Sequence, residues 1–251
     1  APLERPMIIT DVHSAEIIKY ASNAFLAAKI SFINEIANLC ELAGGDVTQV
    51  MKGMGLDPRI GAAFLNAGLG YGGSCFPKDT DALIQTAASL GYEFRSLRAV
   101  VDVNRERIPR LVALIRKVLD PLDGRVIAVL GLAFKPKTDD MREARSVELI
   151  ERLVEAGARV RTYDPVAMDN ARRTLPGAVE YCQSSYEAAE GADAVVVVTE
   201  WNEFKLLNLE RLRQVMRRPL VFDGRNIYEP ERMRRLGFEY HSIGRKPAFP
   251  A

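Results

Sequence analysis

The chain has 251 residues, and 48% of them are hydrophobic, which is enough to build a sizeable core in one large domain or in two of ordinary size. Its 34 lysines and arginines stand against 33 aspartates and glutamates, a net charge of +1. No overall field therefore attracts nucleic acid or an anionic membrane. The wholly apolar runs fall far short of the ~20 residues that span a bilayer, and no signal peptide opens the chain. We expect a soluble protein with a cytoplasmic location.

The first residues and the long segment after them indicate a helical start. Residues 1–12 contain two prolines and a short apolar run, so we interpret them as the end of an element and expect the chain to begin in mid-protein. Residues 14–43 contain neither glycine nor proline and precede Gly44 and Gly45, which predicts one long helix with Ser14 as its N-cap. Further helices are expected at 47–54, 78–90 and 97–118, with a loop over 57–74.

Apolar side chains recur along the 14–43 helix at helical spacing, at Ile17, Ala21, Ala24, Ala28, Phe32, Ile36 and Leu39. The stripe is wide and rich in small residues, so it permits close packing against another helix. One candidate for that other helix is its own copy in a second subunit.

At residues 121–124, Pro-Leu-Asp-Gly, the pattern changes from helices to strands that alternate with helices, which marks a domain boundary. Strands are expected at 126–130, 160–163, 194–199, 220–222 and 239–243, and helices at 146–156, 185–190, 209–216 and 229–235. Five such strands predict a parallel α/β sheet. Ligands of such sheets lie beyond the carboxyl ends of the strands, which points to the loops that start at Gly131, Asp164, Thr199 and Asp223.

The most informative motif is Gly70-Tyr-Gly-Gly-Ser-Cys-Phe-Pro-Lys-Asp79, which places Cys75 behind a flexible glycine loop and ahead of a helix start. A thiol at a helix N-terminus has its thiolate stabilised, and Asp79 falls one helical turn later. A buried, apolar Cys75 is an equally good interpretation of the motif alone. Because Cys75, Cys40 and Cys182 are widely separated, we expect free thiols and no metal site or disulfide.

One polar pair and two residues at strand ends are weaker candidates for functional residues. Lys19 and Asn23 share one helix face and could hold an oxyanion, although an ordinary solvated face is the favoured interpretation of this pair alone. Arg225 follows the fourth expected strand and could reach a phosphate or sugar, or form a structural salt bridge. At Asp164, we favour a turn over a ribose contact.

The loop at 131–143 follows the first expected strand, where a dinucleotide fold carries its phosphate loop, but it lacks the G-x-G-x-x-G pattern. It bears Lys135, Lys137 and Arg142, so it either binds an anion through side chains or is a solvated basic loop.

Taken together, Lys19-x3-Asn23, the cysteine motif, Phe134-Lys135 with Arg142-Glu143, and Asp223-Gly-Arg225 resemble the UDP-glucose 6-dehydrogenases of the UDP-glucose/GDP-mannose dehydrogenase family. The resemblance runs from about Ser14 to Gly244. It implies an all-helical central dimerisation domain at 13–120 and a Rossmann-like parallel α/β UDP-binding domain at 121–246. Residues 1–12 would be a remnant of the N-terminal NAD-binding domain or its linker, and 247–251 a tail.

The resemblance also implies a chemistry: oxidation of UDP-glucose to UDP-glucuronate in two hydride transfers, each with one NAD. Cys75 would capture the intermediate aldehyde as a thiohemiacetal, whose oxidation gives a thioester. Asp79 would position or activate the hydrolytic water, and Lys19 and Asn23 would stabilise oxyanions. A homodimer through the 14–43 helix and a product used in polysaccharide precursors are further implications.

By resemblance, the substrate contacts are Arg59, Phe64, Leu65, Tyr71, Gly72, Gly73, Phe134, Lys135 and Arg225, with Arg59 entering the site of the neighbouring subunit. Lys78 and Arg142 would face the cofactor. Since the G-x-G-x-x-G pattern is missing, we expect this chain alone to lack dehydrogenase activity. The alternatives are a GDP-mannose or UDP-N-acetylhexosamine 6-dehydrogenase and a non-catalytic, dimeric UDP-sugar-binding fragment.

Overall fold

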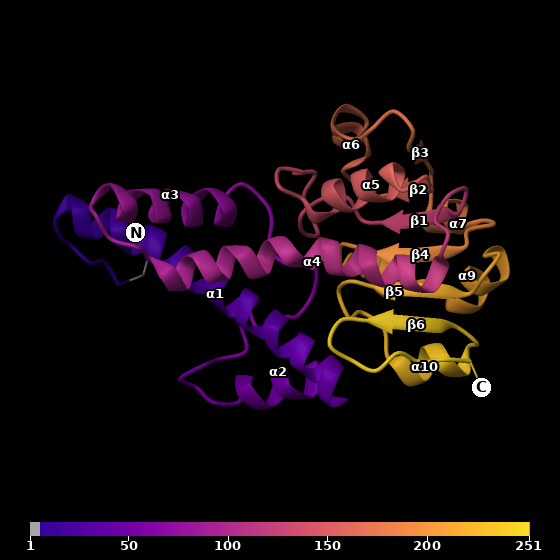
Figure 1. The fold of residues 1–251 in the computed structure, drawn as a ribbon, viewed down its shortest axis with the longest axis horizontal. Helices are drawn as coiled ribbons and strands as arrows, with labels where there is room; N and C mark the ends of the chain where they lie inside the picture. The colour runs from indigo at the N-terminus through magenta and orange to yellow at the C-terminus, as the bar shows by residue number, and fades with distance from the viewer. Residues whose placement is uncertain (1–5, 251) are drawn as a thin grey trace.

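The computed structural model describes residues 6–250, which form a helical part followed by a part built on a β-sheet (Figure 1). The expected N-terminal remnant at 1–12 and tail at 247–251 therefore lie partly outside the described residues. The helical part contains α1 (Val12–Ala43), α2 (Val47–Gly55), α3 (Phe76–Ser89) and α4 (Arg95–Leu119). These four helices were all expected, with ends that differ by one or two residues.

The start of α1 corrects one expectation. Asp11 is the N-cap, because it has extended backbone angles and its Oδ1 accepts a hydrogen bond from the Ser14 N–H at 2.9 Å. Ser14 therefore lies inside the first turn, and its interpretation as the N-cap was wrong. The carboxylate of Asp11, three residues earlier, caps the helix instead. The helix ends at Gly44, whose φ of 77° is the left-handed conformation that glycine adopts without strain.

Only one face of α1 is buried within the described chain, where the helix packs against α3 and α4. That face carries Ala24, Ala27, Ser31, Asn34 and Ala37. Most of the large side chains of the expected apolar stripe lie elsewhere: Ile17, Phe32 and Leu39 are 58%, 53% and 59% exposed. The helix therefore presents a second apolar face that the described residues do not cover.

The sheet has six parallel strands in the order β3-β2-β1-β4-β5-β6. Their bounds are β1 Val126–Leu130, β2 Arg159–Tyr163, β3 Glu180–Tyr181, β4 Ala194–Val197, β5 Leu220–Asp223 and β6 Glu239–Ser242. The expected parallel α/β sheet is confirmed, and β3 is an addition. The order reverses between β1 and β4, which is the point where open α/β sheets bind their ligands. Figure 1 shows the carboxyl ends of the strands directed toward the helical part.

Six helices connect the strands: α5 (Arg145–Glu155), α6 (Met168–Thr174), α7 (Ser185–Ala189), α8 (Asn202–Lys205), α9 (Leu209–Val215) and α10 (Pro230–Arg235). The short helices α6 and α8 were not expected from the sequence. No helix among residues 6–250 is long and apolar enough to cross a membrane.

The long helix α4 joins the two parts. It packs against α5, and Figure 1 shows it passing in front of the sheet. Its buried Ile108, Leu111 and Ile115 belong to the same hydrophobic core as Ile127 and Val129 of β1. The opposite face of the sheet has a separate core, to which α7, α9 and α10 contribute. One face of the sheet therefore shares its core with the helical part.

Candidate active site

A cavity of about 420 Å³ lies between the helical part and the carboxyl ends of β1, β4 and β5. The helical part contributes Ile30, Phe64, Asn66, Gly70, Tyr71, Gly72, Ser74, Cys75 and Phe76 to its walls. The sheet part contributes Phe134, Lys135, Glu200 and Arg225. Three of the four loops expected at a ligand site therefore line this cavity, namely those that follow β1, β4 and β5.

Cys75 is the one cysteine of the chain in contact with this cavity. Its side chain is exposed, whereas Cys40 and Cys182 are buried. Cys75 occupies the N-cap position of α3, with Pro77 in the first turn, and its Sγ lies 3.8 Å from the hydroxyl of Ser74. Burial raises the pKa of both other thiols. The interpretation of Cys75 as a buried apolar residue was wrong, and its position suits a nucleophile.

The carboxylate of Asp79 binds the polar side chains that the sequence suggested for this site. Its carboxylate is 1% exposed, and Oδ2 accepts hydrogen bonds from Lys19 Nζ at 2.6 Å and Asn23 Nδ2 at 2.5 Å. The Lys78 ammonium lies 3.2 Å from Oδ1. Burial alone would raise the pKa of Asp79, but the bonds from Lys19 and Asn23, together with Lys78, outweigh it and lower the pKa. Asp79 is therefore ionised at neutral pH.

The contacts of Asp79 keep Lys19 charged and hold Lys19 and Asn23 together. The hydrogen bond to Asp79 raises the pKa of Lys19, so the ammonium stays charged. One carboxylate oxygen thus binds both a cation and an amide that come from α1, sixty and fifty-six residues away in the chain. The pair is preorganised one helical turn from Cys75, since the Asp79 N–H donates to the Cys75 carbonyl at 2.8 Å.

The glycine loop fits closely against the sheet part. Gly73 has a φ of 80°, and a Cβ there would come within 2.7 Å of the Phe134 ring. Its N–H donates to the Arg142 carbonyl at 2.9 Å. Phe64, on the other side of the cavity, is a non-glycine residue with a φ of 64°, a conformation that carries strain and is frequent at functional sites. The cavity wall therefore depends on a backbone path that only glycine permits at residue 73.

Arg225 connects the two parts of the molecule across the cavity. Its Nε donates to the Val198 carbonyl at 2.6 Å, and its Nη1 lies 3.4 Å from the Gly70 carbonyl. Glu200 forms an ion pair with it at 3.4 Å. The buried Asp223 shapes the turn that carries Arg225, because its Oδ1 accepts the Arg225 N–H at 3.0 Å. The expected structural salt bridge is therefore present, and Arg225 also lines the cavity, where a contact with a phosphate or sugar stays a prediction.

Lys135 lies on the rim of the cavity, exposed, with its ammonium 5.1 Å from the centre of the Phe134 ring. Together with Arg225 it gives the sheet side of the cavity two cations against the single carboxylate of Glu200. This balance suits a ligand with a negatively charged group such as a diphosphate.

The loop after β1 does not form a dinucleotide phosphate site. The Leu132 and Ala133 N–H groups, which a dinucleotide fold would offer to a pyrophosphate, donate to Asp164 Oδ2 at 2.7 and 3.2 Å. The other oxygen of Asp164 accepts two further amides in the turn after β2. The preferred interpretation of Asp164 as a turn residue is thus confirmed. The residues present do not fit NAD in this loop.

Several expected site residues lie apart from the cavity wall. Arg59 is 88% exposed and pairs with Asp57 at 2.6 Å. Leu65 is buried in the core next to the wall residue Phe64. Arg142 and Lys78, the expected cofactor contacts, are 70% and 71% exposed and pair with neighbouring carboxylates. The expected substrate contacts thus reach this cavity except for Arg59, Leu65 and Gly73.

Some wall residues were missed by the sequence reasoning. Glu200 was not singled out, although the loop starting at Thr199 was, so the position at a strand end was the available signal. Ile30 and Asn66 carried no signal, because their contact with the cavity depends on how α1 and the 57–74 loop pack. Within residues 6–250, no three His, Cys, Asp or Glu side chains come together as metal ligands would.

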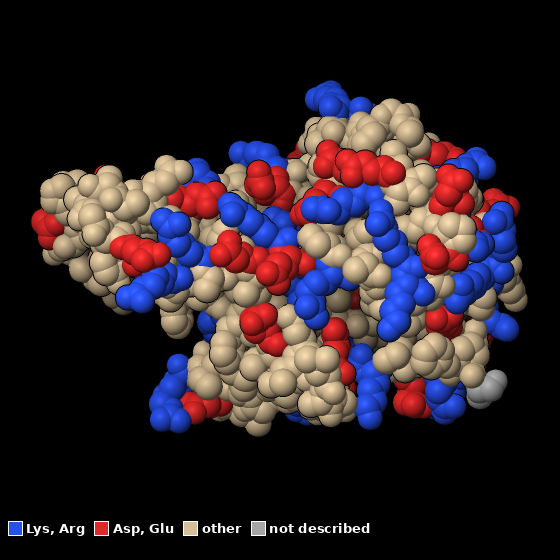
Figure 2. All heavy atoms as spheres, in the orientation of Figure 1, with Lys and Arg blue, Asp and Glu red and all other residues tan. Residues whose placement is uncertain are grey.

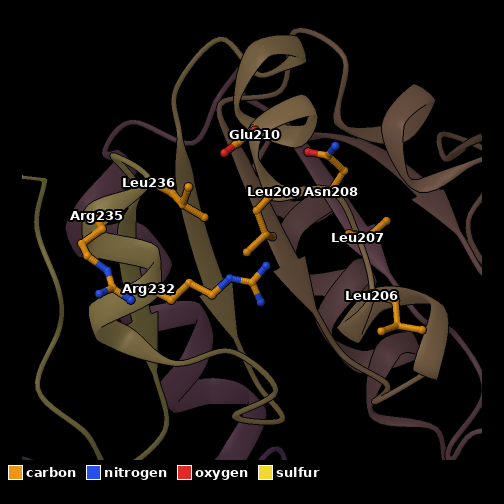
Figure 3. Close-up of a pocket in the computed structure, with 8 residues that line it drawn as sticks. All are labelled: Leu206, Leu207, Asn208, Leu209, Glu210, Arg232, Arg235 and Leu236. Carbon is orange, nitrogen blue, oxygen red and sulfur yellow. The ribbon is translucent and has the colours of Figure 1, made fainter.

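A second cavity, of about 510 Å³, lies far along the sheet part, between the α8–α9 segment and α10 (Figure 3). Leucines and two arginines line it, and Figure 3 shows the Arg232 side chain extending from α10 into the space. It contains no cysteine and lies away from the carboxyl ends of the strands (Figure 1). On the face shown in Figure 2, cationic and anionic side chains are interspersed rather than gathered by sign. The cavity at Cys75 is therefore the candidate active site.

The six-stranded parallel sheet, whose order reverses between β1 and β4, defines a Rossmann-like α/β fold with a cavity at the carboxyl ends of its strands. Comparison with known proteins agrees with this class. Residues 13–106 match the model of the UDP-glucose/GDP-mannose dehydrogenase family, central domain, and residues 128–230 match that family's UDP binding domain. The chain belongs to the UDP-glucose/GDP-mannose dehydrogenase family.

Individual relatives agree with the family match. The chain is 50% identical over 250 residues to UDP-glucose 6-dehydrogenase YwqF of Bacillus subtilis, an alignment that covers 100% of this chain and 57% of that protein. A solved UDP-glucose dehydrogenase from Pyrobaculum islandicum superposes with a TM-score of 0.87 at 41% identity, over 97% of this chain and 54% of that one. A UDP-D-ManNAc dehydrogenase from Pyrococcus horikoshii gives 0.82 at 30% identity, over 97% and 55%. The chain spans about half the length of the curated relatives it matches.

Proposed function

We propose that this chain supplies the UDP-sugar site and the catalytic thiol of an NAD-dependent UDP-glucose 6-dehydrogenase, an enzyme that oxidises UDP-glucose to UDP-glucuronate. The observation that carries the proposal is a single cavity that contains an exposed thiol, Cys75, and two cations, Lys135 and Arg225. The 50% identity to a UDP-glucose 6-dehydrogenase favours glucose over the N-acetylated sugar of the 30% identical relative. A cytoplasmic location accompanies this proposal.

In this proposal the two parts divide the work. Residues 121–246 bind the UDP moiety, with Lys135 and Arg225 on its diphosphate, while residues 13–120 present the sugar to Cys75. NAD would accept the hydride in each oxidation. The described residues form no phosphate loop for it, so only the exposed cations Lys78 and Arg142 are assigned to face the cofactor.

The chemistry assigned to the chain's own residues concerns carbon 6 of the sugar. The Cys75 thiolate adds to the aldehyde carbon, which forms a C–S bond and places a negative charge on the oxygen. Lys19 and Asn23, which both donate to Asp79, are assigned to stabilise that charge. At the thioester stage, water adds to the same carbon, the C–S bond breaks, and the thiolate leaves as the carboxylate forms. Asp79 positions that water through Lys19 and Asn23, which it binds.

We also propose a homodimer formed through the uncovered face of α1. Between α1, α3 and α4 lies an apolar hollow of about 290 Å³, whose walls include Ile17, Phe25 and Phe94. Phe25 is 68% exposed and Phe32 53% exposed. Contiguous apolar surface of this kind is typical of a protein–protein contact. In such a dimer the exposed Arg59 would reach the partner's cavity.

The proposal is tested by calorimetric titration of the chain with UDP-glucose, UDP and GDP-mannose. We expect UDP-glucose and UDP to bind and GDP-mannose not to bind. Preference for GDP-mannose would contradict the assignment of the cavity, and so would a failure of all three compounds to bind.

The thiol is tested by alkylation of the same protein with iodoacetamide. Cys75 should react faster than the buried Cys40 and Cys182, which serve as internal controls, and saturating UDP-glucose should protect it. Equal rates at the three cysteines, or no protection, would leave a dimeric UDP-sugar-binding protein without covalent chemistry as the better description.

A further inference from the structure

We propose that Asn104, a buried residue in the middle of α4, is a positioning residue that holds the Gly68–Tyr71 segment of the cavity wall in its binding geometry. The inference rests on the proposed function, because the cavity is taken to bind a UDP-sugar. Asn104 itself does not line the cavity, so its effect on the ligand passes through the backbone of Tyr71.

The side chain of Asn104 uses both ends of its amide on one residue. Oδ1 accepts a hydrogen bond from the Tyr71 N–H at 2.8 Å, and Nδ2 donates to the Tyr71 carbonyl at 3.1 Å. Asn104 is 4% exposed, so water does not replace either bond. The side-chain amide thereby supplies Tyr71 with the two backbone hydrogen bonds that a neighbouring strand supplies in a sheet. These bonds determine the orientation of the peptide groups on both sides of Tyr71.

Two neighbours hold the start of the same segment in the same way. Asn34 on α1 accepts the Gly68 N–H at 2.8 Å, and Arg107 on α4 donates to the Gly68 carbonyl at 3.1 Å. Both side chains are buried, at 0% and 3% exposure. The wall segment lies outside every helix and strand, so these side chains replace the backbone partners that a regular element would supply.

Gly70 shows how closely the segment is drawn against Asn104. Its φ is 88°, and a Cβ at this position would overlap with the Asn104 side-chain oxygen. Gly70 and Tyr71 both line the cavity, and the ring of Tyr71 packs edge-on against Phe76 at 5.8 Å. Phe76 directly follows Cys75. A displacement of Tyr71 therefore reaches both the cavity wall and the residue next to the thiol.

A purely structural role predicts that a variant loses stability without a separate effect on the cavity. Ser31 on α1 offers a matched control, because it is 2% exposed and its hydroxyl donates to the Val100 carbonyl on α4 at 2.7 Å rather than to the wall segment. Asn104→Ala removes a buried hydrogen-bonding group from the contact between α4 and the wall segment. Ser31→Ala removes one from the contact between α1 and α4. Only the first leaves Tyr71 without its partners.

The experiment measures the Kd for UDP-glucose by calorimetry, the hydrogen exchange rate of the Tyr71 amide, and the Tm of each variant. We expect Asn104→Ala to weaken binding about tenfold and to accelerate exchange at Tyr71, because both hydrogen bonds to Tyr71 are lost. Ser31→Ala should lower the Tm while leaving both the Kd and the exchange at Tyr71 unchanged. Asn104→Gln, which keeps both the acceptor and the donor of the side-chain amide, should weaken binding less and provides the measurement if Asn104→Ala fails to fold.

An unchanged Kd and unchanged Tyr71 exchange in the Asn104 variants would overturn the inference, as would an equal loss of binding in Ser31→Ala. If the unsubstituted chain does not bind UDP-glucose, the proposed function fails. The inference is then decided by Tyr71 exchange and by the rate of Cys75 alkylation, neither of which requires the ligand.

Discussion

The contact between Gly73 and the Phe134 ring allows a test in which backbone strain and side-chain overlap are separated. Gly73→Ala places a methyl group in a left-handed conformation, at a φ of 80°, and within 2.7 Å of a ring that lines the cavity. Gly91→Ala is the matched control, because its φ is 76° and no atom lies within 4 Å of the added Cβ.

The expected losses follow from these two terms. The left-handed conformation costs a residue with a Cβ about 1–2 kcal/mol, and this term applies to both variants. Overlap with packed atoms adds about 1–3 kcal/mol, and this term applies to Gly73→Ala alone. We therefore expect Gly73→Ala to lower the free energy of unfolding by about 2–5 kcal/mol and Gly91→Ala by about 1–2 kcal/mol.

The assay is urea unfolding of the unsubstituted chain and both variants, followed by titration with UDP-glucose. Gly73→Ala should also weaken binding, because the displaced Phe134 ring carries the neighbouring Lys135 with it. Adding Phe134→Leu to Gly73→Ala should recover part of the lost stability, since the smaller side chain makes room for the methyl group. Equal losses of stability and equal binding in the Gly73 and Gly91 variants would refute the reasoning.

Two further predictions concern the charge cluster and α1. The pKa of Asp79 is lowered in the folded chain, so its contribution to stability is complete above the ordinary value of 3.8 and is lost as the pH falls through the folded value. Asp79→Asn should lower the free energy of unfolding by about 1 kcal/mol at pH 7, a figure that is discounted because the paired lysines are exposed. The variant should also flatten the acid side of a profile of stability against pH measured by urea unfolding. An unchanged profile would argue against an ionised Asp79. Phe32→Glu should convert a dimer to a monomer of 27.9 kDa by light scattering, while Leu206→Glu, on an 83% exposed leucine of the sheet part, should not. A monomeric unsubstituted chain at micromolar concentration would exclude the proposed dimer.

The elements that were predicted well are those with a strong local pattern. The strands β1 and β4 are continuous apolar runs, and α1 is a long segment without glycine or proline that ends at Gly44, so sequence alone placed them within two residues of their ends. β3 was missed because Glu180 and Tyr181 form only two residues of polar and aromatic character, and their pairing with β2 comes from the packing of the sheet. A strand this short has no periodicity to detect.

The sequence indicated part of the cavity wall, but not its geometry. The motif around Cys75 indicated a reactive thiol, yet its exposure depends on how α3 packs against α1, which no local pattern encodes. Asp79 and Lys19 are joined by a single ion pair across sixty residues of chain. Asn104 gave no signal, because an asparagine in a helix is ordinary until the loop that it binds is seen beside it.

Helix α4 has a consequence for how the chain can be divided. The change of pattern at residue 121 suggests a cut there, but Ile108, Leu111 and Ile115 of α4 share a core with Ile127 and Val129 of the first strand. A sheet unit that begins at residue 121 would expose that apolar face to water, at about 1.5–3 kcal/mol for each large side chain that loses its cover. A junction before Arg95 would uncover apolar surface in the same way, because α4 also packs against α1 and α3. The sequence pattern therefore changes at residue 121, whereas the hydrophobic core continues across it.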